Sequence, residues 1–162
     1  MGKRAKWRVV AVAGAFRPGE PLDHAVRDTI RLPAELVDTG ELVYRVQERG
    51  IPLMNIRRGD YLVIKARARQ RVSSGETVLA KANGRAYLGR WWATSERRAV
   101  LDETGEPIVE DAGLRVIGVL TTTVRLEGSG DGSSSSGLPD RDRIRRIDVN
   151  RPPTGYFAAR FI

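Results

Sequence analysis

Asn83-Gly84 stands between two runs of strand-forming residues, Thr77–Ala82 and Arg85–Trp92. Both central residues of a tight type I′ turn need positive φ angles, which Asn and Gly tolerate better than other residues. The two runs are therefore predicted to form an antiparallel hairpin. Helical periodicity is nearly absent elsewhere, so we expect the hairpin to belong to an all-β domain.

Other short runs rich in β-branched or aromatic residues are bounded by Gly, Pro or Asn, as is typical of strands. They are residues 9–13, 43–46, 61–64 and 114–120. Pro33–Val37 is suited to one helical turn that begins at its proline. Alternate residues of each strand are expected to face one core, drawn from Tyr61, Leu62, Val63, Ile64, Val78, Leu79, Val116, Ile117 and Val119.

The chain lacks cysteine and has one histidine, His24, in 162 residues. This excludes disulfides, Cys-based zinc sites and thiol nucleophiles, and we expect neither a metal nor a cofactor. No apolar run is long enough to cross a membrane, and the N-terminal stretch lacks the apolar region of a signal peptide. The sequence therefore predicts a cytoplasmic protein without a membrane partner.

Residues 128–137 consist of Gly, Ser and one Asp, which is the composition of a flexible linker. The linker divides the chain into a domain, residues 1–127, and a tail of 25 residues, 138–162. A linker of this kind is typical of an engineered fusion that holds a partner peptide against a domain, and a natural spacer is the alternative. Within the tail, the stretch from Ile144 to Val149 is suited to one strand.

Four segments, in this order and spacing, resemble the C-terminal domain of LexA and its relatives, the S24 self-cleaving peptidases that include UmuD and phage repressors. Residues 19–22 resemble the stretch after the family's scissile Ala-Gly bond. Residues 46–64, which close with Gly59-Asp60 and a hydrophobic strand, resemble the stretch that begins with the nucleophile motif. Residues 75–84 resemble the strand pair that carries the catalytic lysine, and 116–120 the final strand.

The catalytic residues of the family are missing at the matching positions. A Ser-Lys peptidase needs a hydroxyl nucleophile and a lysine whose pKa is lowered by burial. The nucleophile position falls on Gly50 or Ile51, the lysine position falls near Gly89, and the scissile pair falls on Pro18-Gly19. The chain is therefore expected to be a pseudo-protease with no enzymatic activity.

The resemblance implies a protein-interaction or dimerisation module of a transcription regulator or a DNA-damage-response protein, with a protein partner or a second copy of the chain. One alternative is a UmuD-like accessory subunit of a DNA-repair polymerase or other nucleic-acid enzyme. Another is an Arg-rich β barrel that binds nucleic acid directly. In a further alternative the resemblance is false and the chain is simply a small β barrel.

The tail ends in a strongly apolar stretch with three aromatic residues. An extended peptide can add to an exposed sheet edge, where its backbone supplies hydrogen bonds and its side chains fill pockets. We therefore expect the tail, whether native or fused, to dock on the sheet. Its candidate anchors are Tyr156, Phe157, Phe161 and Ile162.

The formal net charge is +8, and 24 of the 28 basic residues are arginine. Arg67, Arg69 and Arg71 alternate, so in an extended segment they would share one face. Such a basic surface could be extended by Arg57-Arg58, Arg85, Arg90 and Arg97-Arg98. Candidate nucleic-acid contacts are therefore Arg67, Arg69, Arg71, Arg90 and Trp91, with Trp91 available to stack on a base; a solvated basic face with Trp91 in the core is the alternative.

Overall fold

The computed structural model describes residues 6–25, 28–67, 71–126 and 144–147. These ranges contain ten strands and one short 3-10 helix, η1 (Pro52–Met54). The strands are β1 (Trp7–Phe16), β2 (Asp28–Pro33), β3 (Leu42–Val46), β4 (Tyr61–Ala66), β5 (Thr77–Ala82), β6 (Arg85–Ala93), β7 (Arg98–Leu101), β8 (Pro107–Glu110), β9 (Arg115–Leu126) and β10 (Ile144–Ile147). The all-β fold predicted from the sequence is confirmed.

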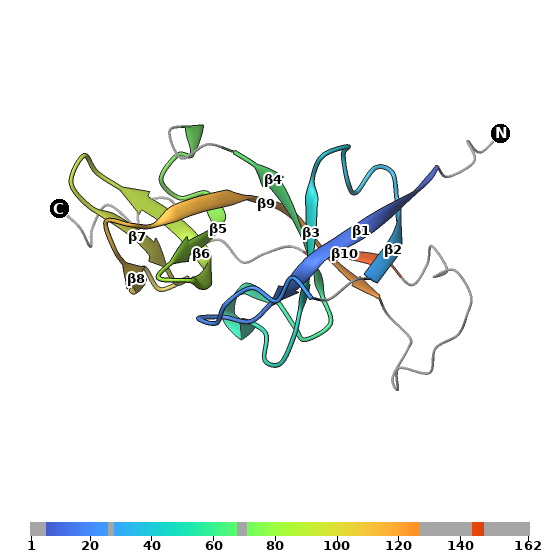
Figure 1. The fold of residues 1–162 in the computed structure, drawn as a ribbon, viewed down its shortest axis with the longest axis horizontal. Helices are drawn as coiled ribbons and strands as arrows, with labels where there is room; N and C mark the ends of the chain where they lie inside the picture. Colours follow the sequence, from blue (N-terminus) through green and yellow to red (C-terminus); the bar gives the residue numbers. More distant parts are fainter. Residues whose placement is uncertain (1–5, 26–27, 68–70, 127–143, 148–162) are drawn as a thin grey trace.

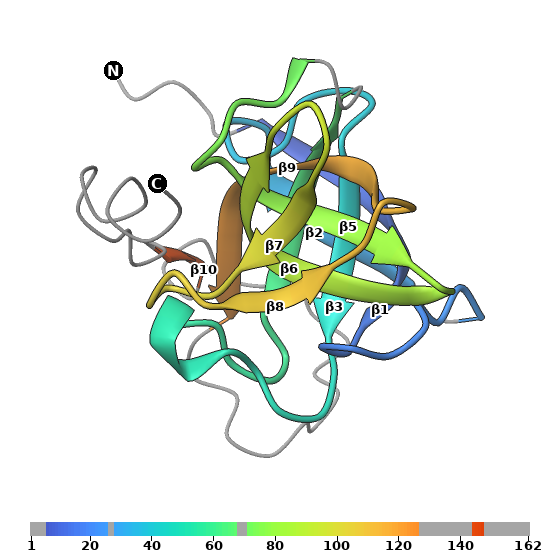
Figure 2. The ribbon, with the colours of Figure 1, turned by 90° about the vertical axis from the view of Figure 1, so that its left-hand side faces the viewer.

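The strands form one sheet in the order β2-β1-β3-β4-β9-β5-β6-β7-β8, and β10 pairs with β9 beside this path. β1 and β3 run parallel, and the other neighbouring pairs are antiparallel. Strands β1 to β3 gather at one end of the molecule and β6 to β8 at the other, with the long β9 running between them (Figure 1). Viewed from the β6–β8 end, the sheet curls strongly about the long axis (Figure 2).

The predicted hairpin is present as β5 and β6, which pair from Thr77↔Arg90 to Ala82↔Arg85. Asn83 and Gly84 connect them with φ angles of 52° and 77°. A β-branched residue at either position would be strained in this left-handed region. The Asn-Gly pair thus sets the register of the hairpin, as its sequence indicates.

Three strands and η1 were not expected from the sequence. β2, β7 and β8 are only four to six residues long and carry charged residues within or beside them, so their apolar pattern is weak.

The segment predicted as a helical turn, Pro33–Val37, makes a turn in which the amide of Leu36 donates to the carbonyl of Pro33 at 2.9 Å. No helix follows it.

The expectation that only alternate residues of each strand are buried is wrong for β4, where Tyr61 to Ile64 are all buried. Leu62 and Ile64 belong to a central cluster with Leu79 and Leu88 from the hairpin. Tyr61 and Val63 face the other side of the sheet, where β1 and β2 cover them. A third cluster gathers Val78, Trp91, Val100 and Leu114. A curled sheet therefore buries both faces of its middle strands.

Truncation of buried side chains in the central cluster should destabilise the domain. Ile64 and Leu79 are fully buried, so Ile64→Ala and Leu79→Ala should each lower the free energy of unfolding by about 2–5 kcal/mol. Ile117→Ala should cost less, because Ile117 is only partly buried. Urea unfolding followed by circular dichroism measures these changes. Val9, which is 64% exposed, is the control, and equal stability of Val9→Ala and Leu79→Ala would contradict the assigned core.

Part of the tail lies within the described residues. β10 adds to the second half of β9, with a register from Ile144↔Leu126 to Ile147↔Thr123. The strand expected near Ile144 is thus present, whereas the linker at 128–137 and the anchors Tyr156, Phe157, Phe161 and Ile162 lie outside the described residues.

Candidate functional site

Backbone occupies the space beside Gly50 and Gly89, two of the positions where the resemblance places catalytic side chains. The alternative nucleophile position, Ile51, carries a partly buried isoleucine. A Cβ atom on Gly50 would lie 2.0 Å from the carbonyl oxygen of Ile56. A Cβ atom on Gly89 would lie 2.4 Å from the carbonyl oxygen of Leu101. Contacts below 3.0 Å require the backbone to move, so neither position admits a side chain in this fold.

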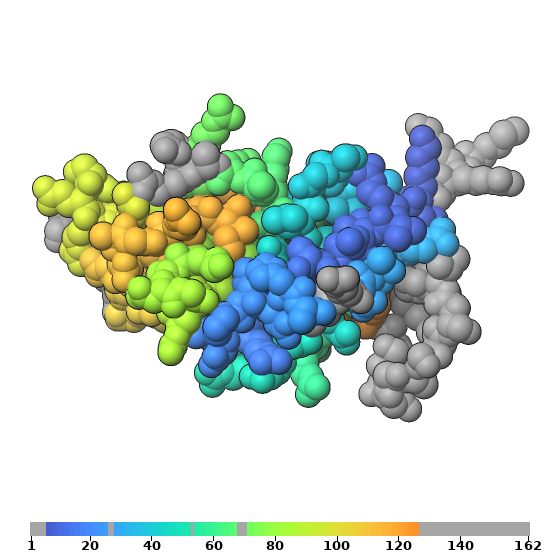
Figure 3. Space-filling view, viewed as in Figure 1, coloured from blue at the N-terminus to red at the C-terminus, as the bar shows by residue number. Residues whose placement is uncertain are grey.

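The segment that matches the cleavage site lies against the hairpin. The amide of Gly19 donates to the carbonyl of Ala86 at 2.9 Å, and the amide of Ala86 donates to the carbonyl of Glu20 at 2.9 Å. In Figure 3 this segment (blue) borders the yellow-green surface of β5 and β6. The segment is therefore held by backbone hydrogen bonds beside the start of β6.

The five residues proposed from the sequence as nucleic-acid contacts do not form one surface. Arg67 is half-buried and pairs with Glu76 at 3.0 Å, Arg71 is exposed, and Arg69 lies outside the described residues. Arg90 and Trp91 are only 4% and 1% exposed.

The prediction that Arg90 and Trp91 contact a nucleic acid is therefore wrong, because both side chains lie in the interior. They lie on β6, which β5 and β7 flank. Arg90 Nη1 donates to Thr77 Oγ1 at 2.8 Å, and Trp91 fills the third core cluster. Trp92, next along the strand, is half-buried, and the Arg97 guanidinium lies 5.6 Å from its ring centre.

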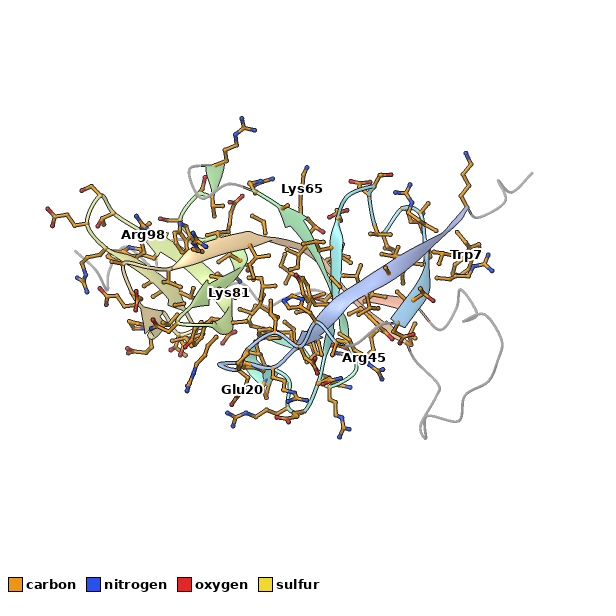
Figure 4. The ribbon with its side chains drawn as sticks, in the orientation of Figure 1. Trp7, Glu20, Arg45, Lys65, Lys81 and Arg98 are labelled. Carbon is orange, nitrogen blue, oxygen red and sulfur yellow. The ribbon has the colours of Figure 1, made fainter. Side chains whose placement is uncertain are left out.

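A different set of arginines lines a polar hollow of about 790 Å³. Its walls come from the end of β1, from β3, from the loop between η1 and β4, and from the end of β9. Arg45, on β3, projects from the lower margin of the molecule in Figure 4, on the opposite side from Lys65. The arginines that line the hollow, named here the arginine hollow, are Arg17, Arg45, Arg57, Arg58 and Arg125.

Asp60 and Arg125 form the buried base of the arginine hollow. Asp60 is 1% exposed, and its two carboxylate oxygens accept hydrogen bonds from Nε and Nη2 of Arg125, both at 2.9 Å. The amide of Arg57 also donates to Asp60, at 2.8 Å, and Arg125 Nη2 donates to the carbonyl of Asn55 at 3.0 Å. This bidentate pair ties β9 to the turn before β4.

Arg17 is held at the wall of the hollow by side chains from the segment after β3. Its Nη2 donates to Gln47 Oε1 at 3.0 Å, and its Nε lies 3.6 Å from Glu48 Oε1. Asp60 and Glu48 therefore balance the charges of Arg125 and Arg17.

The other three arginines of the hollow, Arg45, Arg57 and Arg58, are exposed. Among the described residues, no side-chain hydrogen bond or ion pair joins their guanidinium groups to a partner. The hollow thus carries a net charge of +3 from five arginines and two acids. Guanidinium groups bind carboxylate and phosphate oxygens through paired hydrogen bonds, so this arrangement is suited to an oxyanion ligand.

Tyr61 is the aromatic residue in the lining of the hollow. Burial raises the pKa of its phenol, an effect that Arg45 partly offsets and Asp28 reinforces. The phenol is therefore neutral at physiological pH. Because Tyr61 is 7% exposed, it offers little surface for stacking against a ligand.

The sequence pointed to Arg57-Arg58 only as one of several possible extensions of a basic surface, and it did not indicate Arg17, Arg45 or Arg125. These three residues are distant in sequence and come together only when β1, β3 and β9 enter the sheet. The local signal that could have indicated this site is Gly59-Asp60. An Asp that a turn places in the interior needs a cationic partner.

Within the part of the chain that the structure describes, no group of three or more His, Asp or Glu residues could hold a metal ion, and no helix is long and apolar enough to cross a membrane. The sequence matches no known family model, and no curated protein is significantly similar to it.

Proposed function

We propose that this chain is a catalytically inactive relative of the S24 peptidases that binds an extended protein strand on β9. The pairing of β10 with β9 carries the proposal, because a segment beyond the Gly/Ser tract already completes the sheet there. Backbone hydrogen bonds supply the affinity in such strand addition, as they do in other peptide-binding sheets.

The two glycine positions support the absence of peptidase activity. A nucleophile at Gly50 or a lysine at Gly89 would each place a Cβ atom within 2.4 Å of a carbonyl oxygen. Gly50 and Gly89 therefore have no room for a catalytic side chain, and Ile51, the alternative nucleophile position, has no nucleophilic group. Strands are present at three of the segments that carry the resemblance: β4 after Gly59-Asp60, the β5–β6 hairpin and β9.

The proposal is tested with the full-length chain and a labelled peptide of residues 138–162. The variant Arg145→Pro/Arg146→Pro should free the edge of β9, because adjacent residues of an antiparallel strand point their amides to opposite sides and one proline removes a ladder hydrogen bond. The matched control, Arg145→Ala/Arg146→Ala, removes the same charges and keeps both amides. Fluorescence anisotropy measures binding of the peptide.

The proline variant should bind the peptide saturably, whereas the parent and the alanine control should bind it much more weakly. Their own β10 competes at an effective concentration on the order of millimolar. A peptide with Phe157→Ala and Phe161→Ala should bind less tightly if these aromatic residues are anchors. Failure of the proline variant to bind the parent peptide would contradict the proposal, and a concentration-dependent dimer would identify a second copy as the donor of the strand.

A further inference from the structure

We infer that the arginine hollow binds the phosphodiester backbone of a nucleic acid. The inference does not require a partner strand on β9, where β10 pairs with Arg125 and Leu126 at the border of the hollow. It rests on the net charge of the hollow, the exposure of three of its arginines and the polar character of its walls.

The described residues leave the hollow with a net positive charge, and the net charge of the tail is positive as well. Asp60 and Glu48 balance the charges of Arg125 and Arg17, which leaves the charges of Arg45, Arg57 and Arg58. The tail, residues 138–162, contains six Arg and three Asp, so its own net side-chain charge is +3. The backbone of β10 lies at the border of the hollow, with Arg145 opposite Arg125 in the strand register. The tail as a whole therefore adds positive charge.

The lining favours nucleic acid over an acidic protein. Protein interfaces usually gain their binding energy from an apolar or aromatic centre. The apolar side chains of this hollow are Val46, Tyr61 and Leu126. Val46 and Tyr61 are at least nine-tenths buried, so they offer a partner little apolar surface. Interfaces with nucleic acids are more polar and much more positively charged. The closely spaced phosphates of a nucleic acid fit this lining, because its arginines offer positive charge and paired hydrogen-bond donors. The lining has no apolar anchor of the kind that a protein partner would use.

The arrangement predicts binding without sequence specificity. Phosphate contacts position a nucleic acid but carry no sequence information, which is read at the base edges or through the shape of the duplex. The lining offers no exposed aromatic ring among the described residues on which a base could stack. Affinity should therefore depend strongly on salt and weakly on sequence.

The test measures anisotropy of a labelled single-stranded DNA, its duplex and the RNA of the same sequence with the full-length chain. The test variant is Arg45→Gln/Arg57→Gln/Arg58→Gln. The matched control, Arg71→Gln/Arg85→Gln/Arg115→Gln, removes the same charge from exposed arginines outside the hollow. Circular dichroism melts establish folding, and Arg57→Gln/Arg58→Gln against Arg85→Gln/Arg115→Gln replaces the triple variants if either does not fold.

The hollow variant should bind at least about tenfold more weakly, and the slope of log affinity against log salt should fall by about 2–3, or about 0.7–0.9 for each lost phosphate contact. The control should change both quantities much less. The comparison of the three oligonucleotides identifies which form of the backbone binds best. Equal weakening by both variants, no binding of any oligonucleotide by the parent, or tighter binding of a polyglutamate peptide than of any oligonucleotide would each overturn the inference.

Discussion

Asp60→Ala is expected to destabilise the domain by about 3–5 kcal/mol, because it leaves the charge of Arg125 largely buried without its partner. Arg125 is 14% exposed in its side chain, and both of its donors to Asp60 lie at 2.9 Å. The substitution also leaves the amide of Arg57 without its acceptor. Urea unfolding followed by circular dichroism measures the loss.

Asp38→Ala provides the control, since Asp38 is exposed and the substitution changes the net charge equally. The double variant Asp60→Ala/Arg125→Leu should recover part of the lost stability, because no unpaired charge remains. If Asp60→Ala and Asp38→Ala unfold at the same urea concentration, the pair contributes little to the fold. The arginine hollow would then lack the rigid base described above.

A serine and a lysine placed at the positions that resemble the catalytic sites of the S24 peptidases should damage the fold and give no cleavage. Gly50→Ser is expected to cost about 3 kcal/mol or more, because the new Cβ atom meets the carbonyl oxygen of Ile56 and the backbone must shift. Gly89→Lys meets the carbonyl oxygen of Leu101 in the same way. Thermal melts of each single variant measure the effect.

Gly113→Ser is the matched control, because the nearest atom to its added Cβ is the side-chain Oδ1 of Asp111 at 3.1 Å. Intact-mass measurement after incubation at alkaline pH tests cleavage by the parent and by Gly50→Ser/Gly89→Lys. Neither should be cut, since the parent lacks the hydroxyl nucleophile and the double variant lacks the space to place it. A specific cut beside Gly19 in the parent would refute the proposal of a pseudo-protease.

The parts of the fold that depend on local chemistry were predictable from the sequence. Asn83-Gly84 needs only its own φ angles to define a hairpin, and the apolar runs of β4 and β9 are long enough to be recognised as strands. β7 and β8 depend on tertiary pairing, because each has four residues and its neighbours supply most of its contacts. Burial on both sides of β4 likewise follows from curling of the whole sheet.

The site was less predictable than the fold. Alternation of Arg67, Arg69 and Arg71 suggested a shared face, but β4 ends at Ala66 and Arg67 pairs with Glu76. Arg90 is buried and donates to Thr77, which lies across the hairpin and is adjacent to it only in the folded sheet. Short periodic patterns of charge therefore predict a surface only where the strand that carries them is correctly placed.

The position of β9 in the sheet has a consequence for synthesis of the chain on the ribosome. β1 to β4 and β5 to β8 can each pair with neighbours close in sequence, but β9 lies between β4 and β5 in the strand order. The central cluster, which joins Leu62 of β4 to Leu79 of β5, lies where the two groups of strands meet. The nascent chain must therefore hold two incomplete sheets with open edges until residue 126 has emerged, an interval in which those edges are exposed to wrong pairing.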